Sequence, residues 1–166
     1  MSDEIVIRDL APADVEAVEA IALAAWAPFF DHLREAIGEA FFAADFPDWR
    51  AAKAEQVRRG CTPADGAMAW VAQRGGRVIG FITAYVVNAA TGMAEIGNNA
   101  VHPDHQGRGV GQAMCRHVLG HLKNLGLKYV RVGTGADPHH AAARRAYEKV
   151  GFAVRIPEGF TYYRAL

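Results

Sequence analysis

Three glycines stand within five positions of the chain, at Gly107, Gly109 and Gly111, just before a stretch whose apolar spacing predicts a helix. A glycine inside a helix costs roughly 0.5–1 kcal/mol of stability relative to alanine. At the start of a helix it has a use, because the first N–H groups have no partner within the helix and carry partial positive charge. Without a Cβ the backbone also comes close to a ligand. The pattern therefore indicates an anion site suited to a pyrophosphate.

Two familiar phosphate loops do not match this stretch. A nucleoside triphosphate loop requires Gly-Lys followed by Ser or Thr, and a dinucleotide-binding turn requires G-x-G-x-x-G after an early strand. The chain has no such Gly-Lys run, and its G-x-G-x-G follows the fourth strand that the pattern predicts. From the glycines alone, a turn that holds no ligand also remains open.

The periodicity of apolar residues predicts the strands that position this turn. Residues 67–87 read as a hairpin around Gly75-Gly76, a pair typical of two-residue turns. Single strands are predicted at 4–10, 92–103 and 127–134, and two closing strands within 152–166. The sheet would therefore have about seven strands.

Helical spacing predicts about four helices around that sheet. They are expected at 11–26, at 48–60 with Gly60 as C-cap, from the glycines to about Leu125, and at 137–151. Between them, 26–49 is rich in aromatic residues and is interrupted by Pro28, Gly38 and Pro47, which predicts short helical pieces and loops. Strands with interspersed helices predict one α/β domain over residues 1–166.

Composition excludes several classes of function. Lys and Arg number 18, as do Asp and Glu, so the formal net charge is zero and broad binding to nucleic acid or an anionic membrane is not expected. No apolar run reaches transmembrane length, and the N-terminus does not resemble a signal peptide. Cys61 and Cys115 offer neither a disulfide framework nor a metal cluster, so a reducing, cytoplasmic setting is expected and no metal site is predicted.

Residues flanking the glycines resemble a known family. Gln106 to Gly111, "QGRGVG", is similar to the Q/R-x-x-G-x-G/A signature of the Gcn5-related N-acetyltransferases (GNAT superfamily), and "HHAAARRAYEKVGF" at 139–152 is similar to its second signature, N-x-x-A-x-x-x-Y-x-x-x-G-F. The resemblance implies the GNAT fold, a mixed and mostly antiparallel sheet with a splay between the fourth and fifth strands. His140 stands where the family often has asparagine.

That resemblance implies a site for acetyl-coenzyme A. The loop amides would hold its pyrophosphate, and the exposed backbone of the splayed strand would hold its pantetheine and acetyl carbonyl, the carbonyl at the Val101 N–H. An imidazole at His140 could donate a hydrogen bond to the pantetheine arm. The implied cofactor residues are Ala100, Val101, Gln106, Gly107, Arg108, Gly109, Val110, Gly111, Gln112, His140, Ala143 and Tyr147.

The chemistry implied is direct attack by a primary amine on the thioester in a ternary complex. Tyr147 matches the tyrosine that serves as general acid in the family, and a phenol is protonated at neutral pH. Glu95, 11 residues before Gln106, stands where some members carry a glutamate base; the alternative is a carboxylate that only binds the ammonium or pairs with a surface lysine. A domain that binds acetyl-coenzyme A as a sensor, without turnover, is the alternative function.

The acceptor, a small molecule or a peptide amine, is expected to bind where the family places the segment after the first strand. Acidic residues at 31, 35, 39, 45 and 48 beside aromatic ones would suit a cationic amine. The alternatives are that this aromatic segment forms part of the core or a homodimer contact. The predicted acceptor residues are Trp26, Phe30, Asp31 and Asn99, with Tyr162 or Tyr163 as further candidates. Strand alternation places Asn99 on the face of Glu95, either in the acceptor pocket or stabilising the splay.

Overall fold

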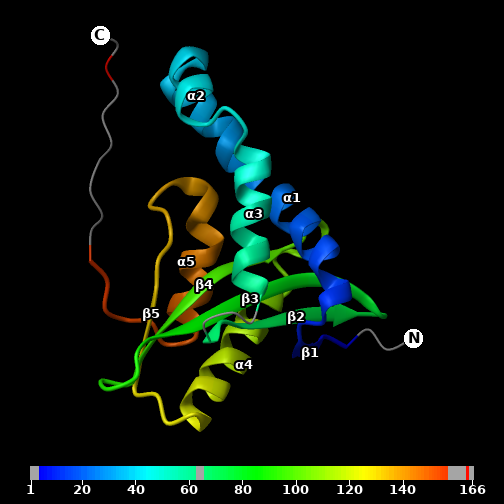
Figure 1. The fold of residues 1–166 in the computed structure, drawn as a ribbon, viewed down its shortest axis with the longest axis vertical. Coiled ribbons are helices and arrows are strands. Elements are labelled where there is room, and N and C mark those ends of the chain that lie inside the picture. Colours follow the sequence, from blue (N-terminus) through cyan, green and yellow to red (C-terminus); the bar gives the residue numbers. More distant parts are fainter. Residues whose placement is uncertain (1–3, 63–65, 157–163, 165–166) are drawn as a thin grey trace.

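A twisted five-stranded sheet forms the centre of the protein (Figure 1). The structure, a computed structural model, describes residues 4–62, 66–156 and 164. In these residues the strand order is β1-β2-β3-β4-β5, antiparallel throughout except for the parallel pair β4–β5. The strands are β1 (Val6–Asp9), β2 (Met68–Arg74), β3 (Arg77–Asn88), β4 (Met93–Val101) and β5 (Tyr129–Val132).

Helices cover both faces of the sheet (Figure 1). Short 3-10 turns at 12–14, 103–105 and 138–140 accompany α1 (Val15–Ile37), α2 (Glu39–Asp45), α3 (Trp49–Cys61), α4 (Val110–Asn124) and α5 (Ala141–Lys149). On one face, α1 and α3 pack their Val18 and Val57 on Phe81 of β3. On the other, Met114 of α4 and Tyr147 of α5 lie in a core with β2, β3 and β4. The two faces of the sheet are therefore covered by different helices, each with its own hydrophobic core.

Local turn chemistry is as the sequence predicts. Gly75 and Gly76 both have positive φ, 55° and 79°, which suits the two-residue turn between β2 and β3. Gly126, at φ 80°, follows α4, and Asp137 begins the last helical segment by accepting hydrogen bonds from the N–H groups of His139 and His140. The predicted hairpin turn is confirmed, and all three features depend on residues that are close together in the chain.

The aromatic segment differs from the prediction. The helix α1 continues through Pro28 to Ile37, although proline cannot donate the hydrogen bond to the residue four positions earlier. Its first half is fixed by packing, with Val18, Ile21 and Ala22 buried under α3 and the sheet. Tertiary packing therefore outweighs the proline, and the break comes at Gly38, which has φ 82°.

Three smaller expectations are also corrected. Helix α3 includes Gly60 and ends at Cys61, so Gly60 is not its cap. Leu125 continues the apolar spacing of Val110, Met114, Val118 and Leu122, which predicts a buried side chain, but it is 56% exposed because it lies just beyond the end of α4. Residues 152–156 form no strand, so the described sheet has five strands rather than about seven; most of the predicted final strand, with Tyr162 and Tyr163, lies outside the described residues.

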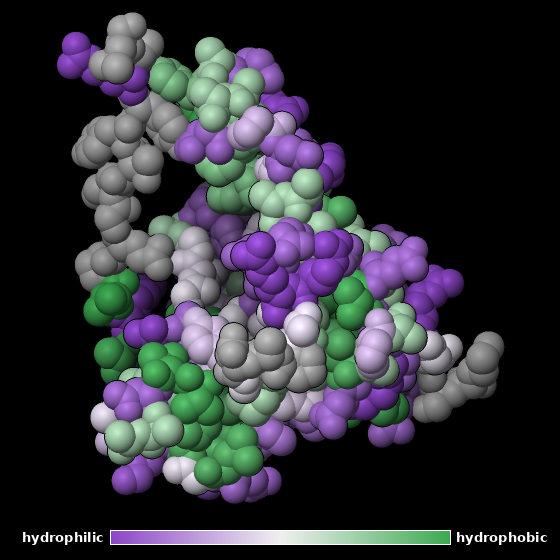
Figure 2. Space-filling model, in the orientation of Figure 1, coloured by the Kyte–Doolittle hydropathy of each residue, from purple (hydrophilic) through white to green (hydrophobic). Residues whose placement is uncertain are grey.

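Apolar side chains gather at the end of the molecule where the β3–β4 turn and the end of α4 lie (lower left in Figure 2). Val86, Val87 and Leu125 are exposed there. None of the described helices is both long and apolar enough to cross a membrane.

Strands β4 and β5 are paired along only the first half of β4. Met93 to Ile96 of β4 pair with Tyr129 to Val132 of β5, where β5 ends, whereas β4 runs on to Val101. This is the expected splay between the fourth and fifth strands, and it leaves one edge of β4 without a neighbouring strand in the described part of the chain.

A β-bulge lies in the same half of β4. Ile82 of β3 opposes Asn99 and Ala84 opposes Ile96, so β4 has one residue more than β3 in this interval. The bulge reverses the facing of the residues that follow it: Ile96 lies in the core with α4, whereas Ala100 lies in the core with α1 and α3.

The close fit of Gly97 at the bulge gives a testable prediction. A Cβ at this position would lie 2.7 Å from Thr83 Oγ1, so Gly97→Ala forces either the Thr83 side chain, whose hydroxyl donates to Asn98 O, or the backbone to shift. We expect the free energy of unfolding to fall by about 1–3 kcal/mol, measured by urea denaturation. Gly120→Ala is the matched control, because Gly120 is exposed within α4 with open space around it. That control should be neutral or gain up to about 1 kcal/mol; equal effects of the two changes would contradict the close fit.

Lys53 of α3 connects three elements on the α1 side of the sheet. Its Nζ donates to Asn98 Oδ1 of β4 at 3.0 Å and to Gln56 Oε1 at 2.9 Å, and lies 3.5 Å from the centroid of the Trp26 ring of α1. No described carboxylate pairs with this ammonium. Burial lowers the pKa of Lys53 to about 8, since neutral amides and a ring replace water only in part.

This lowered pKa predicts a pH-dependent stability. Between pH 8 and 10.5 the unfolded chain keeps the Lys53 proton and the folded protein releases it, so stability rises with pH across that window. Relative to Lys53→Met, the wild-type free energy of unfolding should increase by up to about 3 kcal/mol from pH 7.5 to 10.5 in urea titrations. The control Lys123→Met changes an exposed lysine of α4, so its free energy of unfolding should rise with pH as in the wild type. If the difference in free energy of unfolding between the wild type and Lys53→Met did not change with pH, the desolvation of Lys53 would be contradicted.

Candidate functional site

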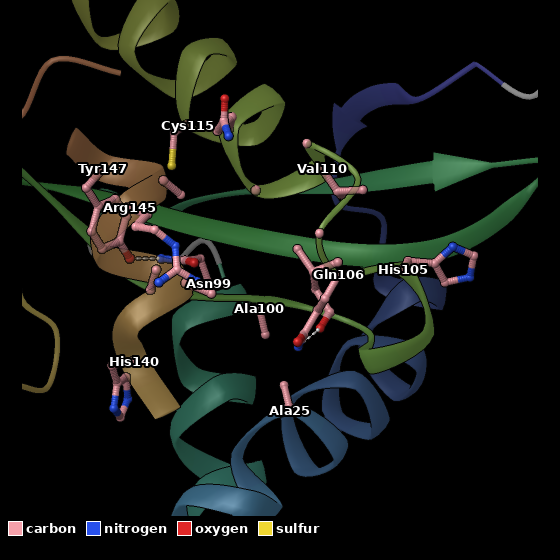
Figure 3. Close-up of a pocket in the computed structure, with 18 of the residues that line it drawn as sticks. Ala25, Asn99, Ala100, His105, Gln106, Val110, Cys115, His140, Arg145 and Tyr147 are labelled. Carbon is pink, nitrogen blue, oxygen red and sulfur yellow. Dashed lines mark hydrogen bonds between the residues drawn. The ribbon is translucent and has the colours of Figure 1, made fainter. Parts of the chain in front are cut away.

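A cavity of about 310 Å³ opens beside the free edge of β4, between α1, α4 and α5 (Figure 3). The turn after β4 closes one side of it. The residues that line it are Ala25, Trp26, Phe29, Asn99, Ala100, Val101, His105, Gln106, Gly107, Gly109, Val110, Gly111, Gln112, Cys115, His139, His140, Ala142, Ala143, Arg145, Ala146, Tyr147 and Lys149.

The glycine turn reaches this cavity with left-handed backbone. Gly107 has φ 74° and Gly109, the N-cap of α4, has φ 80°, a conformation that side chains with a Cβ rarely adopt. Gly111 has no positive φ and lies in the first turn of α4. Within α4 the hydrogen bonds begin with Ala113 N donating to Gly109 O, so the N–H groups of the first turn remain available. This end of α4 therefore presents amides and partial positive charge to the cavity.

The free edge of β4 directs main-chain groups into the same space. His102 N donates to Ile79 O of β3, and in an antiparallel pair successive residues alternate the direction of their N–H and C=O groups. The N–H and C=O of Val101 therefore point away from β3, into the gap left by β5. The Val101 carbonyl accepts a hydrogen bond from Gln106 Nε2 at 3.0 Å, which fixes the turn against the strand.

Tyr147 closes the inner wall of the cavity. It is 6% exposed, and Asn99 Nδ2 donates to its hydroxyl oxygen at 2.5 Å (Figure 3). Burial raises the pKa of Tyr147 to about 12, although the hydrogen bond from Asn99 acts in the opposite direction. Cys115 of α4 borders the same wall, and burial raises the pKa of its thiol to about 11. At neutral pH both groups therefore keep their protons.

His140 stands at the start of α5 with its ring fixed by a carboxylate. His140 Nδ1 lies 2.5 Å from Asp137 Oδ2, so the carboxylate accepts a hydrogen bond from Nδ1–H. Nε2 is then the ring nitrogen that remains for another hydrogen bond. A Cβ on Gly135 would overlap both the Asp137 carboxylate and the His140 ring. The expected contact of His140 with a pantetheine arm would therefore be made by Nε2, and it stays a prediction.

Glu95 is held away from the cavity. Its carboxylate accepts from Arg131 Nε of β5 at 2.5 Å and pairs with Tyr85 of β3, which opposes it in the sheet. Burial alone would raise the pKa of Glu95, but the hydrogen bonds from Tyr85 and Arg131 outweigh it and lower the pKa. Of the two roles expected from the sequence, this geometry favours the pairing role, with an arginine in place of the expected lysine.

Only two of the four predicted acceptor residues line the cavity. Trp26 and Asn99 line the cavity, but Phe30 stacks on Trp49 with ring centroids 4.2 Å apart, and exposed Asp31 does not border the cavity. The acidic side chains at 31, 35, 39, 45 and 48 are exposed, and they belong to the segment from the C-terminal half of α1 to the start of α3, where α2 lies far from the sheet (Figure 1). None of these acidic residues lines the cavity beside β4, and the acidic acceptor pocket stays a prediction.

The bulge corrects the predicted facing of Asn99. It points to the α5 side, where it meets Tyr147, while Asn98 and Glu95 face α1 and α3. Simple alternation would put Asn99 and Glu95 on one face, but the extra residue of β4 reverses the order after Ile96.

Most of the predicted cofactor residues line this one cavity, together with two basic residues that were not predicted. The predicted loop and strand residues line the cavity, except for the exposed Arg108. Arg145 and Lys149 of α5 also line it and were missed, although their spacing of four on the predicted helix put them on one face. The described residues contain no group of three His, Cys, Asp or Glu side chains that could hold a metal ion.

Comparison with known proteins agrees with this geometry. The chain is 34% identical to a mycothiol acetyltransferase of Beutenbergia cavernae over 87% of this chain and 52% of that protein. The chain spans between about a quarter and a half of the length of the mycothiol acetyltransferases it matches.

Two solved structures share the fold. The PaiA N-acetyltransferase of Thermoplasma acidophilum, in complex with coenzyme A, superposes with a TM-score of 0.74 at 19% identity, covering 94% of both chains. The ribosomal-protein-S18-alanine N-acetyltransferase of Escherichia coli gives 0.63 at 22% identity, covering 92% of this chain and 80% of that one. The family model of the acetyltransferase (GNAT) family matches residues 26–152, and the chain belongs to that family.

Proposed function

We propose that this protein transfers the acetyl group of acetyl-coenzyme A to a primary amine of a small molecule or peptide, by direct attack in a ternary complex. The observation that carries the proposal is the convergence of three features on one cavity: the amides of the Gly107–Gly109 turn, the free edge of β4 at Val101, and the buried hydroxyl of Tyr147. Family membership and a fold shared with a coenzyme A complex support it.

The residues of the cavity fit acetyl-coenzyme A. Nothing lies within 4 Å of where a Cβ would stand on Gly107 or Gly109, so the turn is open on its outer side, and the first turn of α4 carries no acidic residue. These amides suit a pyrophosphate. Arg145 and Lys149 add positive charge on the opposite wall. When bound, acetyl-coenzyme A supplies a thioester, which an amine can attack without a covalent enzyme intermediate.

Two groups of the chain act on the reacting atoms in this proposal. The Val101 N–H, directed into the gap between β4 and β5, donates to the carbonyl oxygen as negative charge develops on it. The Tyr147 hydroxyl, protonated at neutral pH because burial raises its pKa to about 12, donates a proton to the departing sulfur. Cys115 stays a thiol and forms no acyl intermediate, because burial raises its pKa to about 11.

The amine must lose a proton to attack, and we assign that proton to water. Glu95 is engaged by Arg131 and Tyr85, has a lowered pKa and does not border the cavity, so it is a weak and remote base. Its proposed role is to fix the β4–β5 pair at the point where the strands part. The reaction is assigned to the cytoplasm because Cys61 and Cys115 are both free and buried.

The glycine turn provides the first test of the function. Isothermal titration should show that the wild-type protein binds acetyl-coenzyme A, and a panel of primary amines should contain acceptors that release coenzyme A. Gly109→Val should weaken acetyl-coenzyme A binding about tenfold or more, because a β-branched residue cannot hold φ 80° without strain. The control Gly120→Ala changes a glycine elsewhere in α4 and should bind normally.

The outcomes separate the candidate functions. Absence of binding by folded wild-type protein, or unchanged binding by Gly109→Val, would contradict the site. Binding without release of coenzyme A from any amine would instead support a sensor that binds acetyl-coenzyme A and does not turn it over.

The role of Glu95 gives a second prediction. Glu95→Gln removes the carboxylate charge but keeps the size of the side chain, so kcat should fall less than about fivefold and the pH profile should keep its midpoint. Arg131→Gln breaks the same ion pair from the other side and should behave alike. A loss of a hundredfold or more in Glu95→Gln alone, with its basic-side pH limb shifted, would identify Glu95 as the base.

A further inference from the structure

The bulge in β4 places Asn99 beneath the one side chain that the reaction needs as an acid. Without the extra residue, Asn99 would face α1 and α3, as its neighbour Asn98 does. With it, the Asn99 amide points to α5 and meets the Tyr147 hydroxyl at 2.5 Å, as Figure 3 shows. Bulges often re-aim a side chain beside an active site.

The polarity of this contact determines what it does. A phenol has one O–H to donate and lone pairs that accept. Because Asn99 Nδ2 donates to the oxygen, a lone pair is occupied and the Tyr147 proton remains free for another acceptor. No other side-chain hydrogen bond of Tyr147 occurs among the described residues, so that proton has no protein acceptor there. Both side chains border the cavity.

Electrostatics gives the contact a second effect. Burial destabilises a phenolate at Tyr147, whereas a hydrogen bond donated to the oxygen stabilises it. The neighbouring Cys115 is a neutral thiol at physiological pH and provides no compensating positive charge. Asn99 is thus the donor that eases loss of the Tyr147 proton in an apolar wall.

We propose that Asn99 is a positioning residue for Tyr147: its amide holds the hydroxyl oxygen so that the hydroxyl proton points into the cavity, toward the sulfur that leaves. This rests on the proposed function. As the amine nitrogen bonds to the carbonyl carbon and the carbon–sulfur bond breaks, the sulfur takes the Tyr147 proton. Water takes both protons that the ammonium loses, returns one to the Tyr147 oxygen and releases the other to solvent, so that the net products are the amide, the thiol and one proton.

This role differs from an acceptor-binding role for Asn99. A residue that contacts the amine would act whether or not the phenol is present. A residue that acts through Tyr147 should have no effect once the hydroxyl is gone. A double-mutant cycle separates the two, because it measures how far the effects of two changes depend on each other.

The experiment compares Asn99→Ala, Tyr147→Phe and the double variant, with the best amine from the acceptor panel. We expect Asn99→Ala to lower kcat about tenfold to a hundredfold and Tyr147→Phe at least as much, both with little change in acetyl-coenzyme A binding by isothermal titration. In the Tyr147→Phe background, Asn99→Ala should cause less than a twofold further loss. Losses that multiply would overturn the proposal and support direct contact between Asn99 and the acceptor.

Two further variants make the test specific. Asn99→Asp keeps the size of the side chain but replaces the donor by an acceptor, so it should capture the Tyr147 proton and lower kcat at least as much as Asn99→Ala; near-normal activity would overturn the proposal. Asn98→Ala changes the same residue type one position away on the opposite face. Its effect should multiply with that of Tyr147→Phe.

One readout does not depend on turnover. In protein labelled with ¹³C at the tyrosine ζ carbon, Asn99→Asp should shift the Tyr147 resonance, identified by its loss in Tyr147→Phe, whereas Asn98→Ala should leave it in place. An unmoved resonance in Asn99→Asp would show that the contact is absent in solution and would overturn the proposal. Normal acetyl-coenzyme A binding without any turnover would overturn the proposed function itself, and with it this role.

Discussion

The limited pairing of β4 with β5 is the constraint on which the rest of the site depends. The two strands share hydrogen bonds only from Met93 to Ile96, and β4 then continues to Val101 with one edge free of β5. Main-chain groups along such an edge need partners, because an unpaired buried N–H or C=O is costly. Gln106 supplies one for the Val101 carbonyl. A thioester ligand that accepts from the Val101 N–H would supply another, so the gap in the sheet is also the binding surface.

Polar side chains of β4 make different contacts on its two faces. On the α5 side, the bulge turns Asn99 to Tyr147. On the α1 side, Asn98 accepts from Lys53, and Glu95 is paired with Arg131. Partly buried polar groups such as these lower stability unless they are hydrogen-bonded. Ile96 and Ala100, packed into the two opposite cores, hold the strand in place between them.

The features that could be predicted from the sequence are those that depend on neighbours in the chain. Gly107 and Gly109 indicate a left-handed turn before a helix, and Gly75-Gly76 indicates a hairpin, because backbone conformation is a property of the residue itself. The apolar spacing of Val110, Met114 and Val118 gives the buried face of α4. Pro28 is the contrary case, since the packing of α1 on α3 and the sheet overrides the local preference to break.

The sequence by itself therefore determined the glycine turn, the helix that follows it, the strand before it and the tyrosine helix after it. Only the tertiary structure decided which side chains meet. One extra residue in β4 places Asn99 with Tyr147, 48 positions away, and separates it from Glu95. The Glu95–Arg131 pair and the stacking of Phe30 on Trp49 likewise join residues from different elements. Periodicity cannot predict such contacts, because they depend on sheet register and helix packing, which are set by the whole chain.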